Sequence, residues 1–380
     1  MLIGIDAGGT STRAVVVDRT GRCLGYGAGG GGNPVALGPA LAGRGISDAV
    51  RMAIRAARDA GSTDGQAALP GVAVLAMAGA SSFAAPGAMA AQVREISGVD
   101  QVEVVSDLFA MFTSGSPYQR GYVLVSGTGA AALRIENDRV AAAADGLGWL
   151  LGDAGSGFWI GHRAVRAALG GLSGHGPATV MTGMLRERLG LPPDGERTPR
   201  GRFVAVEAAI ETFYQMQPIE LAAFASLAFD AAKVPDPKFG GATVSAQFDA
   251  DADPVAVEIL TDARQQLIDT LDAVRLPDVP GPVVMGGTVA KRLPGLTAAV
   301  IASFARDAAH DADDADDAGN NTGDGAAGDA DDSTAATAPE VIIVPDGVAG
   351  AAVLTLRQAG VVVDRQVFDR VAATLAELRV

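Results

Sequence analysis

The sequence predicts an α/β fold in which two similar halves, each a mixed sheet flanked by helices, surround a cleft. Three observations support this prediction. The first thirty residues alternate apolar and polar positions like three short strands joined by tight turns. Helical and strand patterns then alternate up to residue 107, which is typical of a sheet with helices on both faces. From Gly121 the order of strand, glycine turn, strand, polar turn and strand begins again, so a second half of similar design is expected.

Each predicted element has its own signal in the chain. Strands are expected where short apolar stretches end in turn residues, and helices where apolar residues recur three to four positions apart. In the first half the strands are Leu2–Asp6, Thr12–Asp18, Arg22–Gly27, Gly71–Met77 and Val102–Asp107, and the helices are Pro39–Ala60 and Pro86–Ser97.

The second half contains three strands within residues 121–144 and a mostly helical stretch from His162 to Arg275. Two buried strands, Pro282–Gly287 and Val341–Pro345, and an amphipathic helix at Asp364–Arg379 follow. We therefore expect a first domain at 1–117 and a second at 118–360 with a helical insertion at 162–275. The helix at about 364–380 is expected to pack back on the first domain.

Composition and charge exclude several classes of function. Eleven acidic residues and no Lys or Arg fall between Asp307 and Glu340, which leaves −4 of the net charge of −15 for the remainder. We expect 307–340 to be a disordered acidic loop and the body to bind no nucleic acid, because it has no basic stripe. No apolar run approaches the roughly 18 residues of a membrane span. Cys23 is the single cysteine, so no internal disulfide or cysteine-rich metal site can form, and a cytoplasmic protein is expected.

Two glycine turns suit the binding of a polyphosphate. The first, DAGGTST, follows a buried strand; its Gly8 and Gly9 would bring backbone N–H groups together, and Thr10, Ser11 and Thr12 would add hydroxyl donors. Asp6 could hold the water shell of a Mg²⁺ ion on those phosphates. The second turn, SGTGA, contains Gly127, Thr128 and Gly129 at the equivalent place in the second half. Each turn alone could equally be an ordinary hairpin turn.

A third turn, MGGTVA, leaves a strand and enters a helix. Its Gly286 and Gly287 would let a flat adenine ring lie against the backbone, although a plain strand-to-helix turn has the same residues. The segment DGLGWLLGDAGSGFWIG, from Asp145 to Gly161, holds six glycines and both tryptophans of the chain. So many glycines indicate tight turns or a close approach of backbone to a ligand.

These motifs, in this order, resemble the N-acetylglucosamine kinase branch of the actin-like sugar kinases, also known as the BadF/BadG-type ATPase family. The similarity runs from Leu2 to about Leu354, apart from the acidic insert, and GWLLGDAGSGFWIG is its most specific part. The resemblance implies two actin-like (ribonuclease H-like) domains and ATP with Mg²⁺ as cofactors. It also implies an amino sugar as substrate, phosphorylation of its 6-hydroxyl, and a homodimer as the common assembly.

The resemblance also assigns residues to the sugar side of the site. Asp107, in VVSDLFAMFTSG, would be the base that takes the proton from the sugar hydroxyl; as a residue of this sequence alone it could instead cap the helix that follows. Asn33 and Asp153 would contact the sugar, with Gly148 and Trp149 lining the pocket. From the residues alone, Asn33 could be a turn residue before proline and Trp149 a core residue.

Two positions depart from the family pattern. Many relatives have a basic residue where Ser11 stands, with Arg13 as a candidate substitute, and most have Glu where this chain has Ala154. The missing carboxylate leaves open which amino sugar is preferred and whether the protein is a sugar-sensing relative that binds without transferring phosphate. An iron–sulfur activator of the same family would need several cysteines. Trp159 and His162 are expected to be structural.

Overall fold

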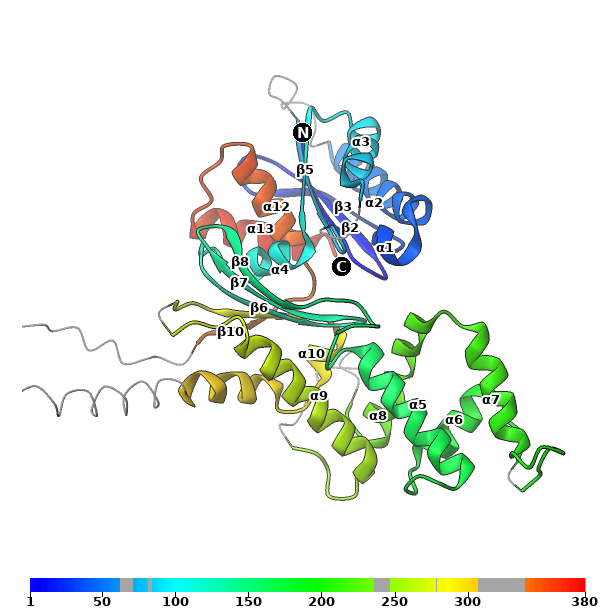
Figure 1. The fold of residues 1–380 in the computed structure, drawn as a ribbon. Coiled ribbons are helices and arrows are strands. Elements are labelled where there is room, and N and C mark those ends of the chain that lie inside the picture. The colour runs from blue at the N-terminus through cyan, green and yellow to red at the C-terminus, as the bar shows by residue number, and fades with distance from the viewer. Residues whose placement is uncertain are drawn as a thin grey trace, which may run out of the picture.

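The computed structural model describes residues 1–61, 71–80, 84–193, 195–235, 247–277, 279–306 and 339–379. It shows two sheets stacked with helices between and outside them (Figure 1). The expected acidic loop 307–340 lies outside the described residues except for its last two. Among the described helices, none combines the length and apolar character that crossing a membrane requires.

The first sheet has five strands in the order β3-β2-β1-β4-β5. β1 runs antiparallel to β2 and parallel to β4, and β4 runs parallel to β5. Its buried core strands are apolar at nearly every position, which is typical of strands covered on both faces. The strand bounds are β1 (Leu2–Ala7), β2 (Thr12–Val17), β3 (Cys23–Gly29), β4 (Val72–Met77) and β5 (Gln101–Ser106).

The second sheet repeats this topology in the order β10-β9-β6-β7-β8. β6 is antiparallel to β7 and parallel to β9, just as β1 relates to β2 and β4. The predicted internal repeat and the predicted fold of two mixed sheets flanked by helices are therefore confirmed. The strand bounds are β6 (Gly121–Ser126), β7 (Ala130–Glu136), β8 (Arg139–Asp145), β9 (Val283–Gly286) and β10 (Val341–Ile343).

Helices cover both faces of the first sheet. One face packs on α2 and α3 through a cluster that includes Ile5, Ile46 and Leu75, and the other packs on α12 and α13. α4 and α12 lie between the two sheets, because α4 also packs on the second sheet, where Phe112 joins Val123 (Figure 1). The bounds are α1 (Pro34–Leu37), α2 (Pro39–Asp59), α3 (Pro86–Ser97), α4 (Asp107–Gly115), α12 (Val348–Gln358) and α13 (Arg365–Glu377).

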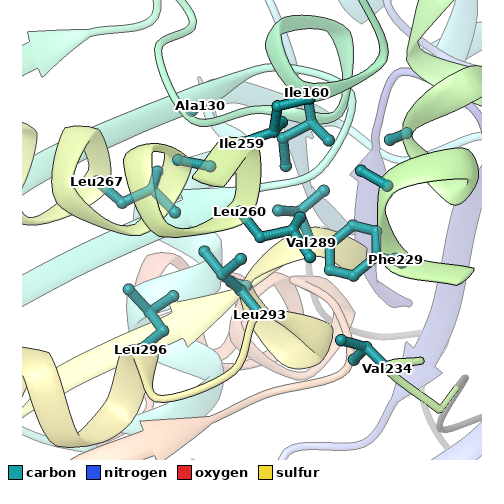
Figure 2. Close-up of a cluster of buried hydrophobic side chains, with 14 of the residues drawn as sticks. Ala130, Ile160, Phe229, Val234, Ile259, Leu260, Leu267, Val289, Leu293 and Leu296 are labelled. Carbon is teal, nitrogen blue, oxygen red and sulfur yellow. The ribbon is translucent and has the colours of Figure 1, made fainter. Parts of the chain in front are cut away.

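The outer face of the second sheet carries the largest core cluster and the predicted helical region. Figure 2 shows Ile160 of α5, Phe229 of α8 and Leu260 of α9 converging in this cluster. Residues 296–306 are also helical. The bounds are α5 (Gly157–Ser173), α6 (Met181–Leu189), α7 (Val204–Gln215), the 3₁₀ helix η1 (Pro218–Phe224), α8 (Ala225–Ala231), α9 (Pro254–Asp272) and α10 (Thr288–Arg292).

The last helices pack on the first sheet. The Thr355 hydroxyl of α12 donates to the carbonyl of Ile3 at 3.0 Å, and a Cβ on Gly4 would lie 2.4 Å from the backbone nitrogen of Ala352. α12 therefore belongs with the first sheet, and the boundary expected at residue 360 falls one helix too late. The Cys23 amide of β3 donates to the Thr374 hydroxyl of α13 at 2.9 Å, so α13 lies on the same half.

Candidate active site

The predicted site residues of the first half gather where the parallel strands β1 and β5 end and the helices α4 and α12 begin. Asp6 is the penultimate residue of β1, and Asp107 is the first residue of α4, directly after β5. Carboxyl ends of parallel strands meet at one edge of a sheet, which is where open α/β sheets bind ligands. The Asp107 carboxylate is close enough to Asp6 to raise its pKa.

The first glycine turn is a tight and open hairpin. The Gly8 amide donates to the carbonyl of Ser11 at 3.0 Å, while an added Cβ on Gly9 would meet nothing within 4 Å. Gly31 and Gly32 support the turn from outside: the Gly32 amide donates to the Gly8 carbonyl at 2.9 Å, and a Cβ on Gly31 would lie 2.5 Å from the Gly9 carbonyl oxygen. The backbone of Gly8, Gly9 and Thr10 is thus held in shape with its tip exposed.

Thr12 is not a member of this open turn. It is fully buried as the first residue of β2, and its hydroxyl has no partner among the described residues. A Cβ on Gly32 would lie 2.6 Å from that hydroxyl. The predicted donation from Thr12 to phosphate stays a prediction, and the side chain lies on the sheet face that α2 covers. Strand alternation places Thr12 on the face of Ala14 and Val16, a signal that was available in the sequence.

Asp6 and Asp107 both sit in surroundings that disfavour their charge. Burial, together with the nearby Asp346 and Asp107 carboxylates, raises the pKa of Asp6 to about 7. A hydrogen bond from the Gly347 amide partly offsets this rise. Burial raises the pKa of Asp107 to about 6. Ser106, not Asp107, is the N-cap of α4, because its hydroxyl accepts from the Leu108 amide at 3.2 Å. Asp107 is therefore not needed as the cap that the sequence alone allowed.

The second glycine turn, SGTGA, is in direct contact with the third turn, MGGTVA, whose proposed role gives it the name adenosine turn. A Cβ on Gly287 would lie 2.2 Å from the carbonyl oxygen of Ser126, and Gly287 has a φ of 96°. Only glycine fits such a position without strain. The second turn is also tied to the start of α5, since the Gly157 amide donates to the Gly127 carbonyl at 2.7 Å.

Helix α4 connects Asp107 to the adenosine turn. Met111 lies one helical turn after Asp107, and residues four apart share a helix face. A Cβ on Gly286 would lie 2.6 Å from the sulfur of Met111. This contact between the two halves was not predicted, because nothing in the local sequence of either segment indicates it.

Asp145 organises the glycine-rich segment that follows β8. Its carboxylate accepts hydrogen bonds from the amides of Asp153 at 2.6 Å and Ala154 at 2.8 Å. Both Asp145 and Asp153 adopt left-handed backbone conformations, with φ of 60° and 57°. Aspartate is one of the few non-glycine residues that tolerates them. Asp145 was not predicted as a site residue, although the sequence places it eight residues before another aspartate in a glycine-rich loop.

Asp153 itself lies against the second glycine turn. Its carboxylate accepts from the Ala130 amide at 3.3 Å, and a Cβ on Gly129 would lie 2.8 Å from one of its oxygens. Burial raises the pKa of Asp153. Its predicted contact with a sugar stays a prediction, while its contact with the second glycine turn is direct.

The other residues predicted to contact the sugar are Asn33, Gly148 and Trp149, and each leaves part of its surface accessible. Asn33 caps α1, since its side-chain oxygen accepts from the amides of Val35 at 2.9 Å and Ala36 at 3.2 Å, which leaves its NH₂ group for a ligand. Gly148 has a φ of 83° with open space around it. Trp149 is 39% exposed and packs one side on Phe158.

Trp159 and His162 have the structural roles that were expected. The guanidinium of Arg163 covers the Trp159 ring at 4.0 Å, and Trp159 packs on the core of the second half. The His162 ring stacks on Phe158, with a plane angle of 4°.

A Mg²⁺ ion fits the donor set around Asp6 only with phosphate and water as further ligands. Among the described residues, no group of three His, Cys, Asp or Glu side chains could hold a metal by itself. Mg²⁺ in phosphoryl-transfer sites usually keeps several waters and takes one or two carboxylates. A cation there would also offset the repulsion that Asp346 and Asp107 impose on Asp6.

Comparison with known proteins finds one matching ATPase family and similarity to several kinases. The model of the BadF/BadG/BcrA/BcrD ATPase family matches residues 3–309. The N-acetyl-D-glucosamine kinase of Dictyostelium discoideum is 30% identical over 194 residues, which is 50% of this chain and 61% of that protein. An N-acetylmuramic acid/N-acetylglucosamine kinase of Clostridium acetobutylicum is 29% identical over 99 residues, 26% of this chain and 32% of that one. The chain thus matches less than two thirds of the length of either relative.

Two solved structures share the fold over nearly their whole length. One, provisionally named an N-acetylglucosamine kinase of Chromobacterium violaceum, gives a TM-score of 0.61 at 19% identity and covers 93% of this chain and 98% of its own. The other carries the same provisional name in Porphyromonas gingivalis and gives a TM-score of 0.58 at 18% identity, over 94% and 99% of the two chains. At this identity the similarity establishes the arrangement of the two sheets.

Proposed function

Because this chain belongs to the BadF/BadG/BcrA/BcrD ATPase family, we propose that it is an ATP-dependent kinase that phosphorylates the 6-hydroxyl of N-acetylglucosamine or a related amino sugar such as glucosamine. One observation carries the proposal. Asp107, with its pKa raised to about 6, stands at the end of β5 on the helix that contacts the adenosine turn. The names of the two curated relatives supply the substrate class.

In this proposal Asp107 is the general base. A sugar hydroxyl is a poor nucleophile, and a positioned carboxylate lets it lose its proton while the new O–P bond forms. The hydroxyl proton passes to Asp107 as the bond from the γ-phosphorus to the bridging oxygen breaks and ADP leaves. A base with a pKa near 6 is ionised at neutral pH and still a useful proton acceptor.

The glycine turns hold the nucleotide. Gly8, Gly9, Thr10 and Ser11 form the first phosphate turn, Gly127, Thr128 and Gly129 the second, and Gly286 and Gly287 border the adenosine. At Gly9 the absence of a side chain leaves the backbone accessible to phosphate oxygens. The Gly127 amide instead donates to the carbonyl of Gly129 at 2.9 Å and so shapes the second turn. Mg²⁺, when bound through Asp6 and water, would neutralise charge on the transferred phosphoryl group.

The sugar would lie between groups from both halves of the molecule. The free NH₂ of Asn33 can donate to a sugar hydroxyl or to the acetamido oxygen, and Trp149 offers an aromatic face to the apolar face of the ring. Gly148 leaves room beside Trp149, and Asp153 holds the loop against the phosphate turn.

An ADP-release assay with a panel of hexoses tests the proposal. We expect turnover with N-acetylglucosamine or glucosamine, dependence on Mg²⁺, and a phosphorus–proton coupling at C6 of the product by NMR. The Asp107→Asn variant is the matched control, because it should bind sugar without turning it over. ADP release that no amino sugar stimulates would contradict the kinase and favour a sugar-sensing or ATP-hydrolysing protein.

A further inference from the structure

The tripeptide Pro345–Gly347, which leads from β10 of the second sheet into α12 of the first half, is held by four separate elements. Lys291 of α10 donates from Nζ to the carbonyl of Pro345 at 3.0 Å. The Gly347 amide donates to Oδ2 of Asp6 on β1 at 2.9 Å. Between these two residues, Asp346 forms ion pairs with Arg13 of β2 and with Arg379, which follows α13.

The Asp346 carboxylate is nearly buried, and both of its oxygens are engaged. Nε of Arg13 lies 3.2 Å from Oδ2, and Nη2 of Arg379 lies 2.7 Å from Oδ1. Oδ1 also accepts from the amide of Val348, the first residue of α12, at 3.2 Å. Hydrogen bonds between charged groups are about twice as strong as neutral ones. The carboxylate is therefore fixed in orientation, and with it the backbone of the next residue.

Asp346 is joined to the proposed metal-facing carboxylate by a closed ring of contacts. Asp346 precedes Gly347, whose amide binds Asp6; Asp6 pairs in register with Arg13; and Arg13 returns to Asp346. A Cβ on Gly347 would lie 3.1 Å from Oδ1 of Asp6, so the backbone lies directly against the carboxylate. Any rotation of Asp346 is thus passed to the hydrogen bond that orients Asp6.

Arg379 is the one member of this network that comes from outside the ring. It follows α13, and its guanidinium also lies over the ring of Tyr26 at 5.6 Å. Its side chain is 25% exposed, so it is more enclosed than an ordinary surface arginine. Without Arg379, Asp346 would keep its ion pair with Arg13 and the more distant charge of Lys291, and its carboxylate could turn toward Arg13.

We propose that Arg379 is a positioning residue of the nucleotide site, which with Arg13 holds Asp346 and Gly347 so that Asp6 faces the metal-bound phosphates. The inference rests on the nucleotide site of the proposed function but not on the identity of the sugar. Removal of a group that orients a metal ligand commonly lowers metal affinity tenfold to a hundredfold.

The test measures nucleotide binding with and without metal. Calorimetry compares the Kd of ADP with excess Mg²⁺ and the Kd of ADP in EDTA for the wild type, Arg379→Met and Arg379→Lys. Arg365→Met is the matched control, since Arg365 lies on α13 and, within the described part of the chain, pairs with the exposed Asp369. Asp346→Asn removes the charge that Arg379 holds and keeps the shape of the side chain.

We expect Arg379→Met to weaken ADP binding about tenfold in Mg²⁺ and to leave ADP binding in EDTA unchanged. Arg379→Lys should lose less affinity than Arg379→Met. In a protein that already carries Asp346→Asn, the further change Arg379→Met should not weaken ADP binding any more, because the two residues act in one chain of contacts.

Equal weakening with and without Mg²⁺ would make Arg379 a general electrostatic contact and overturn the proposal, as would no change at all. If Arg379→Met fails to fold, Asp346→Asn tests the proposal by the same measurement, the Kd of ADP in Mg²⁺ compared with the Kd in EDTA. A wild type that binds MgADP but phosphorylates no amino sugar would remove the proposed function while leaving this test intact.

Discussion

Asp107→Asn separates the catalytic from the structural role of the proposed base. Asparagine keeps the size of the side chain and an oxygen that can accept from the Leu108 amide, so sugar and ATP affinity should persist. General bases contribute about a hundredfold to ten-thousandfold. We expect kcat to fall at least about a hundredfold, which corresponds to about 2.7 kcal/mol in activation free energy at 25 °C.

The pKa of Asp107 fixes the pH dependence of the wild type. Because the base must be ionised, kcat/KM should fall tenfold per pH unit below about pH 6. The folded-state pKa lies above the unfolded value of 3.8, so the ionised carboxylate costs stability. This cost is absent below pH 4, grows up to about pH 6 and is constant above. Asp107→Asn should therefore melt at a higher temperature than the wild type at pH 8 and show no such gain at pH 4.

Turnover and thermal stability can each refute the assignment of Asp107 as the base. Coupled ADP release gives kcat, quenching of tryptophan fluorescence gives sugar affinity, and thermal melts at the two pH values give stability. Asp48→Asn, at an exposed position of α2, is the control and should change none of them. Turnover close to that of the wild type would remove Asp107 from the mechanism. A variant that melts at a lower temperature at pH 8 would show that burial does not destabilise this carboxylate.

Three further substitutions test the loops around the site. Gly287→Ala should weaken ATP binding at least tenfold by calorimetry, because the new Cβ would force the adenosine turn away from Ser126; Gly183→Ala in α6, with nothing within 4 Å, should not. Asp145→Ala should leave the amides of Asp153 and Ala154 without their acceptor, lower stability by about 1–3 kcal/mol in urea unfolding and raise the KM for sugar. Trp149→Ala should raise the KM for sugar several-fold with kcat nearly unchanged, whereas an unchanged KM would remove Trp149 from the pocket.

The elements that could be predicted from the sequence are those whose signal is local. The strands Leu2–Ala7 and Val283–Gly286 and the helix Pro86–Ser97 follow directly from apolar patterns and bounding turn residues. The repeat of five strands was predictable for the same reason, since each half carries its own copy of the pattern.

The parts that could not be predicted depend on residues far apart in the chain. Gly286 of β9 lies against the Met111 side chain of α4, and Asp346 is held by arginines at positions 13 and 379. α12 joins the first sheet because Gly4 lets its backbone approach β1. None of these contacts has a signature within a window of neighbouring residues.

α4 fixes one part of the proposed site, the base and the adenosine turn, but not the residues proposed to contact the sugar. α4 carries Asp107 at its start, touches Gly286 through Met111 and packs Phe112 on the second sheet, so the base and the adenosine turn are held by one element. Asn33 and Trp149 instead stand on separate halves: Asn33 caps α1, and Trp149 packs on Phe158 of α5. In the proposed function, sugar binding would therefore depend on groups that α4 does not fix, whereas α4 holds Asp107 and the turn at Gly286 together. Substitutions at Asn33 or Trp149 should consequently act on KM, and those at Asp107 on kcat.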